Sequence, residues 1–122
     1  MKEKILIIGA SGLIGQELTY QLFNRNYNVI AGVNTSGIFP SLPRIQVKID
    51  LLSKDNTREI VTSESPDAII NLSAMSSIQK CEKEKEAAYN LNVLGVKNLL
   101  EAIELLNNKP LFQVVEEVAN LS

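Results

Sequence analysis

The feature that most constrains the fold is the sequence ILIIGASGLIG. In it, residues 5–8 are four consecutive branched aliphatics, and Gly9, Gly12 and Gly15 follow at intervals of three. An uninterrupted apolar run of this length is typical of a strand buried on both faces of a sheet. From Leu13 the pattern changes to a helical period. Glycine destabilises helices and strands alike, so three of the chain's six glycines placed this close together indicate a tight turn between a buried strand and a helix.

The rest of the sequence alternates between strand and helix patterns. Strands are expected at residues 4–8, 28–33, 45–49, 67–72 and 111–115. Helices are expected from Leu13, through Glu64 after a cap at Ser53 or Asp55, and over residues 84–107. This alternation predicts an α/β fold, and right-handed crossovers give a doubly wound, Rossmann-like parallel sheet with strand order 3-2-1-4-5. We expect residues 1–122 to form a single domain whose sheet is truncated after the fifth strand.

A glycine turn between a strand and a helix has a chemical use. Gly9 allows the chain to turn, Gly12 allows a ligand to approach the backbone, and Gly15 allows the helix to pack closely on the strand. The free N–H groups of Leu13 and Ile14, together with the positive end of the helix dipole, then form an anion site that suits a pyrophosphate. The alternative is that the glycines only shape the turn. The candidate phosphate-binding residues are Gly9, Ser11, Gly12, Leu13, Ile14 and Gly15.

The spacing G-x-x-G-x-x-G resembles that of the short-chain dehydrogenase/reductase superfamily, and two further segments are similar to its extended branch. The segment SPDAIINLSA resembles that branch's fourth strand, where Asn71, Ser73 and Ala74 match an N-x-A-A-like motif. The segment CEKEKEAAYNLNVLGVKNLLEA resembles its A-x-x-x-N-x-x-G-x-x-N-L-x-x-A pattern. Within the branch, the chain is most similar to dTDP-4-dehydrorhamnose reductases and related sugar-nucleotide reductases and epimerases, as far as about Val115.

The resemblance implies an NAD(P)-dependent oxidoreductase and assigns contacts with its cofactor. Leu72, Ser73 and Ala74 would line the cofactor after the fourth strand. Asp50, with Leu51 beside it, would accept a hydrogen bond from the adenine amino group. The alternative for Asp50 is a simple cap or turn residue.

Asn92 lies on the stripe of the last long helix that should face the sheet, three residues before Gly95. A polar amide in that place must find hydrogen-bond partners. The resemblance implies that Asn92 holds the active-site backbone and a proton-relay water. The alternative, a buried asparagine that bonds to the backbone beside a strand end, is compatible with this. Gly95 destabilises the middle of a helix by about 1 kcal/mol relative to alanine, which indicates close approach of the helix to the sheet.

The second strand ends at Asn34, and Thr35 and Ser36 follow. Many NAD-binding proteins carry an acidic residue here, which binds the ribose 2′-hydroxyl. Nothing at this position would repel a 2′-phosphate and the hydroxyls could bond to one, although no arginine is adjacent. NADP is therefore the expected cofactor, bound in part by Asn34 and Thr35, and NAD is the alternative.

Composition excludes several other classes of protein. Twelve basic and fourteen acidic residues give a net charge of −2, with no basic stripe that would indicate nucleic acid as the partner. No apolar run approaches the ~18 residues of a membrane helix. With no histidine and a single cysteine, Cys81, the chain has neither a histidine base nor the ligands for a structural zinc site. A cytoplasmic location is the default for such cysteine usage.

The superfamily transfers a hydride with a tyrosine of a Y-x-x-x-K pair as the acid or base. This chain has three tyrosines, and none has a lysine four residues on. The residues four after Tyr20, Tyr27 and Tyr89 are Asn24, Ala31 and Val93. No catalytic residue is therefore assigned, and the chain alone is predicted to be an inactive cofactor-binding half without its catalytic half.

Two alternatives remain open at this point. The chain is either a non-catalytic regulatory module of the same fold or an interaction fragment that needs a partner chain to complete its sheet. A fifth strand at the edge of the sheet would expose unpaired N–H and C=O groups. Together with the long helix before it, this edge favours a homo-oligomer.

Overall fold

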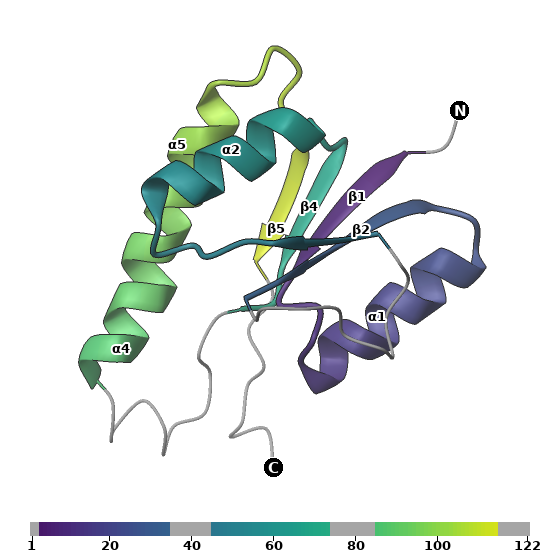
Figure 1. Ribbon diagram of the computed structural model, residues 1–122, viewed down its shortest axis with the longest axis horizontal. Helices are drawn as coiled ribbons and strands as arrows, with labels where there is room; N and C mark the ends of the chain where they lie inside the picture. The colour runs from purple at the N-terminus through teal and green to yellow at the C-terminus, as the bar shows by residue number, and fades with distance from the viewer. Residues whose placement is uncertain (1–2, 35–44, 74–84, 115–122) are drawn as a thin grey trace.

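The computed structural model describes residues 3–34, 45–73 and 85–114, which form a five-stranded parallel sheet with helices on both faces (Figure 1). The strands are β1 (Lys4–Ile8), β2 (Asn28–Val33), β3 (Gln46–Lys48), β4 (Ala68–Asn71) and β5 (Leu111–Val114). The helices are α1 (Leu13–Asn24), α2 (Lys54–Glu64), α4 (Lys85–Tyr89), the π-helical segment η1 (Asn90–Gly95) and α5 (Val96–Glu104).

The predicted topology is confirmed. Neighbouring strands run β3-β2-β1-β4-β5, and each pairing is parallel. The chain therefore moves outward from β1 to β3, returns to the other side of β1 at β4 and ends the described sheet at β5. The strand boundaries differ from the predicted ones by at most one residue at each end. Among the described helices, none is long and apolar enough to cross a bilayer.

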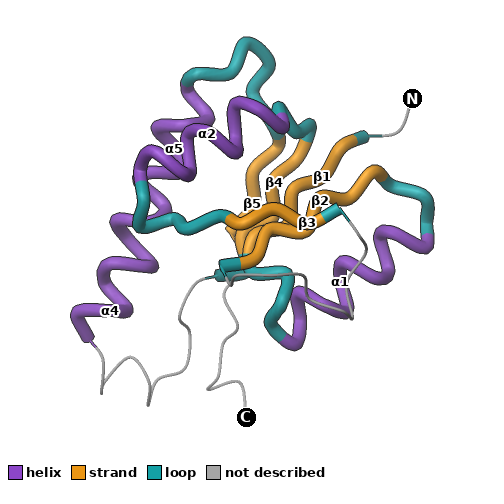
Figure 2. Tube along the Cα trace, viewed as in Figure 1, coloured by secondary structure: helices purple, strands orange, loops and turns teal. Residues whose placement is uncertain are grey.

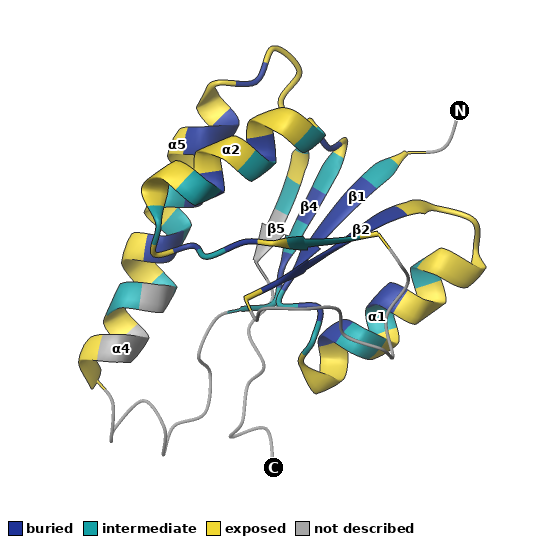
Figure 3. Ribbon diagram, in the orientation of Figure 1, coloured by how far each residue is buried: buried dark blue, intermediate teal, exposed yellow. Residues whose placement is uncertain are grey.

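Each face of the sheet carries its own apolar core, because successive side chains on a strand point to opposite faces. On one face, Leu6 of β1 packs with Val61 of α2 and Leu99 of α5. On the other face, Ile7 belongs to a core against which Leu18 of α1 packs. Figure 3 shows that the buried residues are concentrated on β1 and β2, while the outer sides of the helices are exposed.

The two faces are covered unequally. Helices α2, α4 and α5 lie on one side of the sheet and α1 lies on the other (Figure 2). In the described structure, α1 contacts β1 and β2. On the same side as α1, Ile70 and Leu72 at and beyond the end of β4 are half-buried, and Leu111 of β5 is 77% exposed. The half of this face over β4 and β5 therefore has no helix across it among the described residues.

The predicted long helix over residues 84–107 is interrupted. A short α4 passes into the π-helical turn η1 before α5 begins. The predicted sheet-facing stripe is otherwise confirmed at Gly95, Leu99 and Ala102, which are buried, while Asn92 is half-buried. A Cβ at Gly95 would lie 3.1 Å from Leu51 Cβ, so the close approach predicted there is made to the segment that follows β3.

Candidate cofactor site

The β1–α1 turn begins at Gly9, whose φ of +84° is a conformation that side-chain-bearing residues rarely adopt. The N–H groups of Gly9 and Ala10 both donate to the carbonyl oxygen of Gly32, at 3.0 and 3.1 Å. The turn is thereby fastened to the neighbouring strand β2. A Cβ at Gly9 would lie 2.8 Å from the carbonyl carbon of Leu72, so the backbone after β4 packs directly against this glycine.

Gly12 is the N-cap of α1 and has an extended backbone, with φ −71° and ψ 171°. Its N–H donates to the Gly9 carbonyl at 3.2 Å, and its own carbonyl accepts the N–H of Gln16 at 2.9 Å. No side chain caps this end of the helix, and the first turn contains no acidic residue. The first-turn N–H groups of a helix have no acceptor within the helix, so this end presents donors and the positive end of the dipole to an anion.

The two residues that carry those donors are exposed. The side chains of Leu13 and Ile14 are 88% and 43% exposed, and both begin the helix directly after Gly12. Ser11 is half-buried, and its carbonyl accepts a hydrogen bond from Gln16 Nε2 at 2.7 Å. The backbone of the turn is therefore held by local bonds while its helix end stays open.

Gly15 confirms the predicted close packing of the helix on the strand. It is buried, and a Cβ there would overlap the Gly9 carbonyl oxygen and lie 2.8 Å from Ala10 Cα. Only a hydrogen in place of the side chain allows α1 to start this close to the end of β1.

The chain leaves β4 beside this turn. Leu72 N–H donates to the Ile8 carbonyl at 2.8 Å, which extends the pairing of β4 with β1 by one bond. The Ser73 N–H and hydroxyl both donate to Asn71 Oδ1, at 3.0 and 2.6 Å. Leu72 and Ser73 therefore lie next to Gly9, whereas Ala74 lies outside the described residues.

Asp50 serves the turn after β3. Its Oδ1 accepts the N–H of Leu52 at 3.0 Å, and its backbone bonds to the side chains of Asn56 (2.6 Å) and Thr57 (2.9 Å). The turn role that the sequence offered as the alternative is thus present. Among the described residues, no partner is seen for the second carboxylate oxygen of this half-buried side chain.

Leu51 is 3% exposed and its side chain belongs to the core between the sheet and α5. Its carbonyl accepts a hydrogen bond from Asn98 Nδ2 at 2.8 Å. Any contact of Leu51 with a cofactor would therefore be made by the rest of its backbone. The burial follows from α5, which approaches this segment through Gly95.

The geometry brings most of the predicted residues to one edge. The strands are parallel, so the glycine turn after β1, the Leu72–Ser73 segment after β4 and the exposed Asn34 after β2 all lie at their carboxyl ends. The strand order reverses between β1 and β4, which is where doubly wound sheets bind ligands. Thr35 lies outside the described residues, and Asn92 is half-buried in η1 on the far face of the sheet from α1.

Comparison with known proteins gives the same fold and a family. The sequence model of the NAD dependent epimerase/dehydratase family matches residues 5–115 of this chain. A dTDP-4-dehydrorhamnose reductase from Aggregatibacter actinomycetemcomitans is 35% identical over 100 residues, which cover 81% of this chain and 30% of that protein. The methionine adenosyltransferase 2 subunit beta of Danio rerio is 30% identical over 91 residues, which cover 74% of this chain and 26% of that protein.

A solved structure has the same arrangement of elements. The UDP-glucose 4-epimerase from Brucella ovis, in complex with NAD, matches with a TM-score of 0.77 and 24% identity, over 87% of this chain and 33% of that one. The chain thus spans about a third of the length of the relatives that it matches.

Proposed function

Because this chain belongs to the NAD dependent epimerase/dehydratase family, we propose that it is the NAD(P)-binding part of a sugar-nucleotide reductase or epimerase. In this role it binds the dinucleotide at the carboxyl edge of the sheet, with the pyrophosphate on the first turn of α1. The hydride chemistry and the sugar-nucleotide site belong to a catalytic half that these 122 residues do not supply.

The observation that supports the proposal most directly is the backbone conformation of Gly12 and the space around its Cβ position. This residue has an extended backbone, and a Cβ would meet only the Gly9 carbonyl oxygen at 3.5 Å, an ordinary contact. The fold itself therefore does not require glycine at this position. Close approach of a ligand to the open end of α1 does require it, because a side chain would occupy the place of the pyrophosphate.

We infer that the cofactor is NADP rather than NAD. Asn34 is exposed at the carboxyl end of β2, where an acidic residue would bind the ribose 2′-hydroxyl and repel a 2′-phosphate. An amide does not repel that phosphate. A cytoplasmic setting, where NADP is available to a reductase, fits the single cysteine of the chain.

The test is a titration of NADPH and NADH against the wild type and Gly12→Glu. The carboxylate of the variant should reduce dinucleotide affinity by more than tenfold, since it adds both bulk and like charge at the pyrophosphate. Phe23→Glu places the same charge at a position of α1 that is 51% exposed and outside the groove lined by Leu13 and Ile14, and it serves as the matched control. Equal binding by the wild type and Gly12→Glu contradicts the proposal, and tighter binding of NADH than NADPH contradicts the cofactor preference.

We also propose that the chain forms a homo-oligomer through the outer side of α4, η1 and α5. Val93 and Leu100 are 46% and 47% exposed and line the same groove along η1 and α5, which forms an apolar stripe. Tyr89, at the end of α4 just before this stripe, is 57% exposed. Lys97 and Glu104 border this stripe with opposite charges. An antiparallel second copy would bury the apolar side chains and place the lysine of one copy near the glutamate of the other.

A second candidate function is a non-catalytic regulatory or interaction module. The observation that favours it is the half of the sheet over β4 and β5 that α1 leaves open. A separate open groove of about 890 Å³ runs along α1 and is lined by Leu13, Leu18 and Tyr20 among others. Turnover by any assembly that contains the chain would favour the first function. Cofactor-dependent binding to another protein without turnover would favour the second.

A further inference from the structure

Asn71, the last residue of β4, has a polar side chain buried in an apolar environment. It is 1% exposed, and its partners in register are Ile8 of β1 and Val114 of β5. Alternation puts it on the same face of the sheet as Ile69, which belongs to the core covered by α2 and α5. Its Oδ1 accepts both hydrogen bonds from Ser73, whereas its Nδ2 is buried without a hydrogen-bond partner.

The stability of the sheet does not explain this asparagine. A buried N–H without an acceptor destabilises the folded state, and β-branched apolar residues are preferred in strands. A valine would therefore suit the position at least as well. However, a valine side chain could not accept the hydrogen bond from the N–H of Ser73, two residues further on. That bond closes the tight turn at the end of β4.

That turn lies against the glycine turn. The positions nearest to a Cβ built on Gly9 are the carbonyl carbon of Leu72 at 2.8 Å and the nitrogen of Ser73 at 2.9 Å. These two atoms form one peptide bond, so a single peptide plane makes the contact. The nitrogen of this peptide bond carries the hydrogen that Asn71 Oδ1 accepts.

We propose that Asn71 is a positioning residue for the dinucleotide site. Its Oδ1 fixes the Leu72–Ser73 peptide against Gly9 and thereby sets the geometry between the β4 exit and the start of α1. Because the side chain is buried, it acts through this backbone and does not touch the ligand. The inference rests on the proposed function, since the affinity that it controls is that for NADPH.

The test compares Asn71→Val with a control of the same kind. Among the described residues, Thr19 Oγ1 in α1 is the other buried side-chain atom without a hydrogen-bond partner. Thr19→Val removes this atom and should leave the Leu72–Ser73 peptide in place. Both variants should unfold at urea concentrations equal to or above that of the wild type. Only Asn71→Val should lose NADPH affinity, by about tenfold for the loss of one to two hydrogen bonds. Lower stability with unchanged affinity would show a purely structural role and overturn the inference.

Amide hydrogen exchange tests the same link without a ligand. In the unliganded protein, Asn71→Val should accelerate exchange at Ser73 and shift the Gly9 amide resonance, and Thr19→Val should do neither. An unchanged Ser73 amide overturns the inference whether or not the wild type binds NADPH. Failure of the wild type to bind, with the Ser73 and Gly9 changes present, counts against the proposed function alone.

A third variant separates the backbone from the hydroxyl. Ser73→Ala removes the 2.6 Å bond from the hydroxyl and leaves the N–H bond to Asn71 Oδ1. Its loss of affinity should be smaller than that of Asn71→Val. An equal or larger loss would assign the effect to the hydroxyl and overturn the role of the peptide.

Discussion

At the scale of single residues, the three glycines of the β1–α1 turn meet three different constraints. Gly9 has a positive φ and a backbone neighbour where its Cβ would be. Gly15 is fixed by packing alone, because α1 starts against the end of β1. Gly12 meets neither constraint, since its backbone is extended and its Cβ position is open. The fold alone therefore accounts for Gly9 and Gly15, and the proposed pyrophosphate contact would account for Gly12.

This difference gives a prediction about stability. Gly15→Ala should lower the free energy of unfolding by about 1–3 kcal/mol, because the new methyl group overlaps the Gly9 carbonyl oxygen and forces α1 to move. Gly12→Ala should lower it by less, about 0.5 kcal/mol, because the methyl group fits and only the N-cap preference for glycine over alanine is lost. Urea denaturation of the two variants measures both values. Equal destabilisation by the two alanines would mean that the turn is packed differently.

The glycine turn could be predicted from sequence because its spacing and its flanking patterns are local. The roles of Leu51 and Asn71 could not be predicted in the same way. Leu51 is buried by α5, and no pattern near residue 51 reveals that contact. Asn71 was visible as a match to a motif, but its proposed positioning role depends on the contact of the Leu72–Ser73 peptide with Gly9, far away in the chain. The one local signal was a serine two residues after an asparagine, which is the spacing of an Asx turn.

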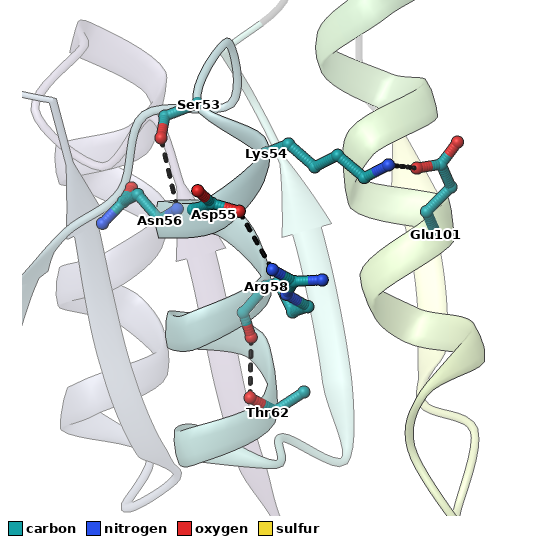
Figure 4. A network of polar contacts seen from close by, with 7 residues as sticks. All are labelled: Ser53, Lys54, Asp55, Asn56, Arg58, Thr62 and Glu101. Carbon is teal, nitrogen blue, oxygen red and sulfur yellow. Dashed lines mark hydrogen bonds and ion pairs between the residues drawn. The ribbon is translucent and has the colours of Figure 1, made fainter.

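At the scale of elements, α2 shows how a weakly apolar helix is held. Ser53 is its N-cap, and its hydroxyl accepts the N–H of Asn56 at 3.2 Å (Figure 4). The Asn56 side chain in turn accepts the N–H of Asp50 at 2.6 Å. The sequence left the cap open between Ser53 and Asp55. Asp55 instead lies in the first turn and pairs with Arg58 at 2.9 Å. Exposed ion pairs of this kind contribute little to stability, so the N-cap and the core contacts are what stabilise α2.

Removal of the cap should therefore be measurable. Ser53→Ala should lower the free energy of unfolding by about 0.5–2 kcal/mol, since it leaves an N–H of the first turn without its acceptor. Ser63→Ala, at an exposed position near the other end of α2, should change it by no more than about 0.5 kcal/mol. Thermal or urea unfolding followed by circular dichroism compares the pair. Indistinguishable midpoints would show that Ser53 does not stabilise α2.

The π-helical turn η1 could not be predicted from sequence. Its residues have the helical pattern of apolar positions that an α-helix would have, and a π turn differs only in which carbonyl each N–H reaches. The one irregular feature visible in the sequence was a glycine, Gly95, in the middle of the predicted helix. Gly95 closes η1 and packs on Leu51, so the glycine marks the place where the helix changes its winding. Such turns inside helices are frequent at functional sites, and η1 contains the candidate residue Asn92.

At the scale of the whole molecule, the topology could be predicted from the alternation of strands and helices, but the exposed apolar surfaces could not.

One such surface is the stripe on α4, η1 and α5, and it leads to a prediction about assembly. The wild type should be a dimer in light scattering, and Leu100→Glu should be a monomer because it buries a charge in the apolar stripe. Leu105→Glu adds the same charge at a residue that is 59% exposed and lies off the stripe, and it should remain a dimer. A monomeric wild type at high concentration contradicts the proposed oligomer.

The last prediction concerns turnover by the 122-residue chain. Positioned acid–base catalysis contributes about 10²–10⁴-fold to a rate, and none of the three tyrosines has the lysine that the superfamily pairs with it. Tyr20 and Tyr89 are more than half exposed on the outer sides of α1 and α4. Cofactor binding alone does not replace the missing acid, because an interaction that is equal in the ground and transition states does not accelerate the chemical step. We therefore expect no oxidation of NADPH with dTDP-4-dehydrorhamnose in a steady-state absorbance assay, even at concentrations where NADPH binds. Activity that survives repurification and disappears in Gly12→Glu would show that the chain contains a catalytic group of its own.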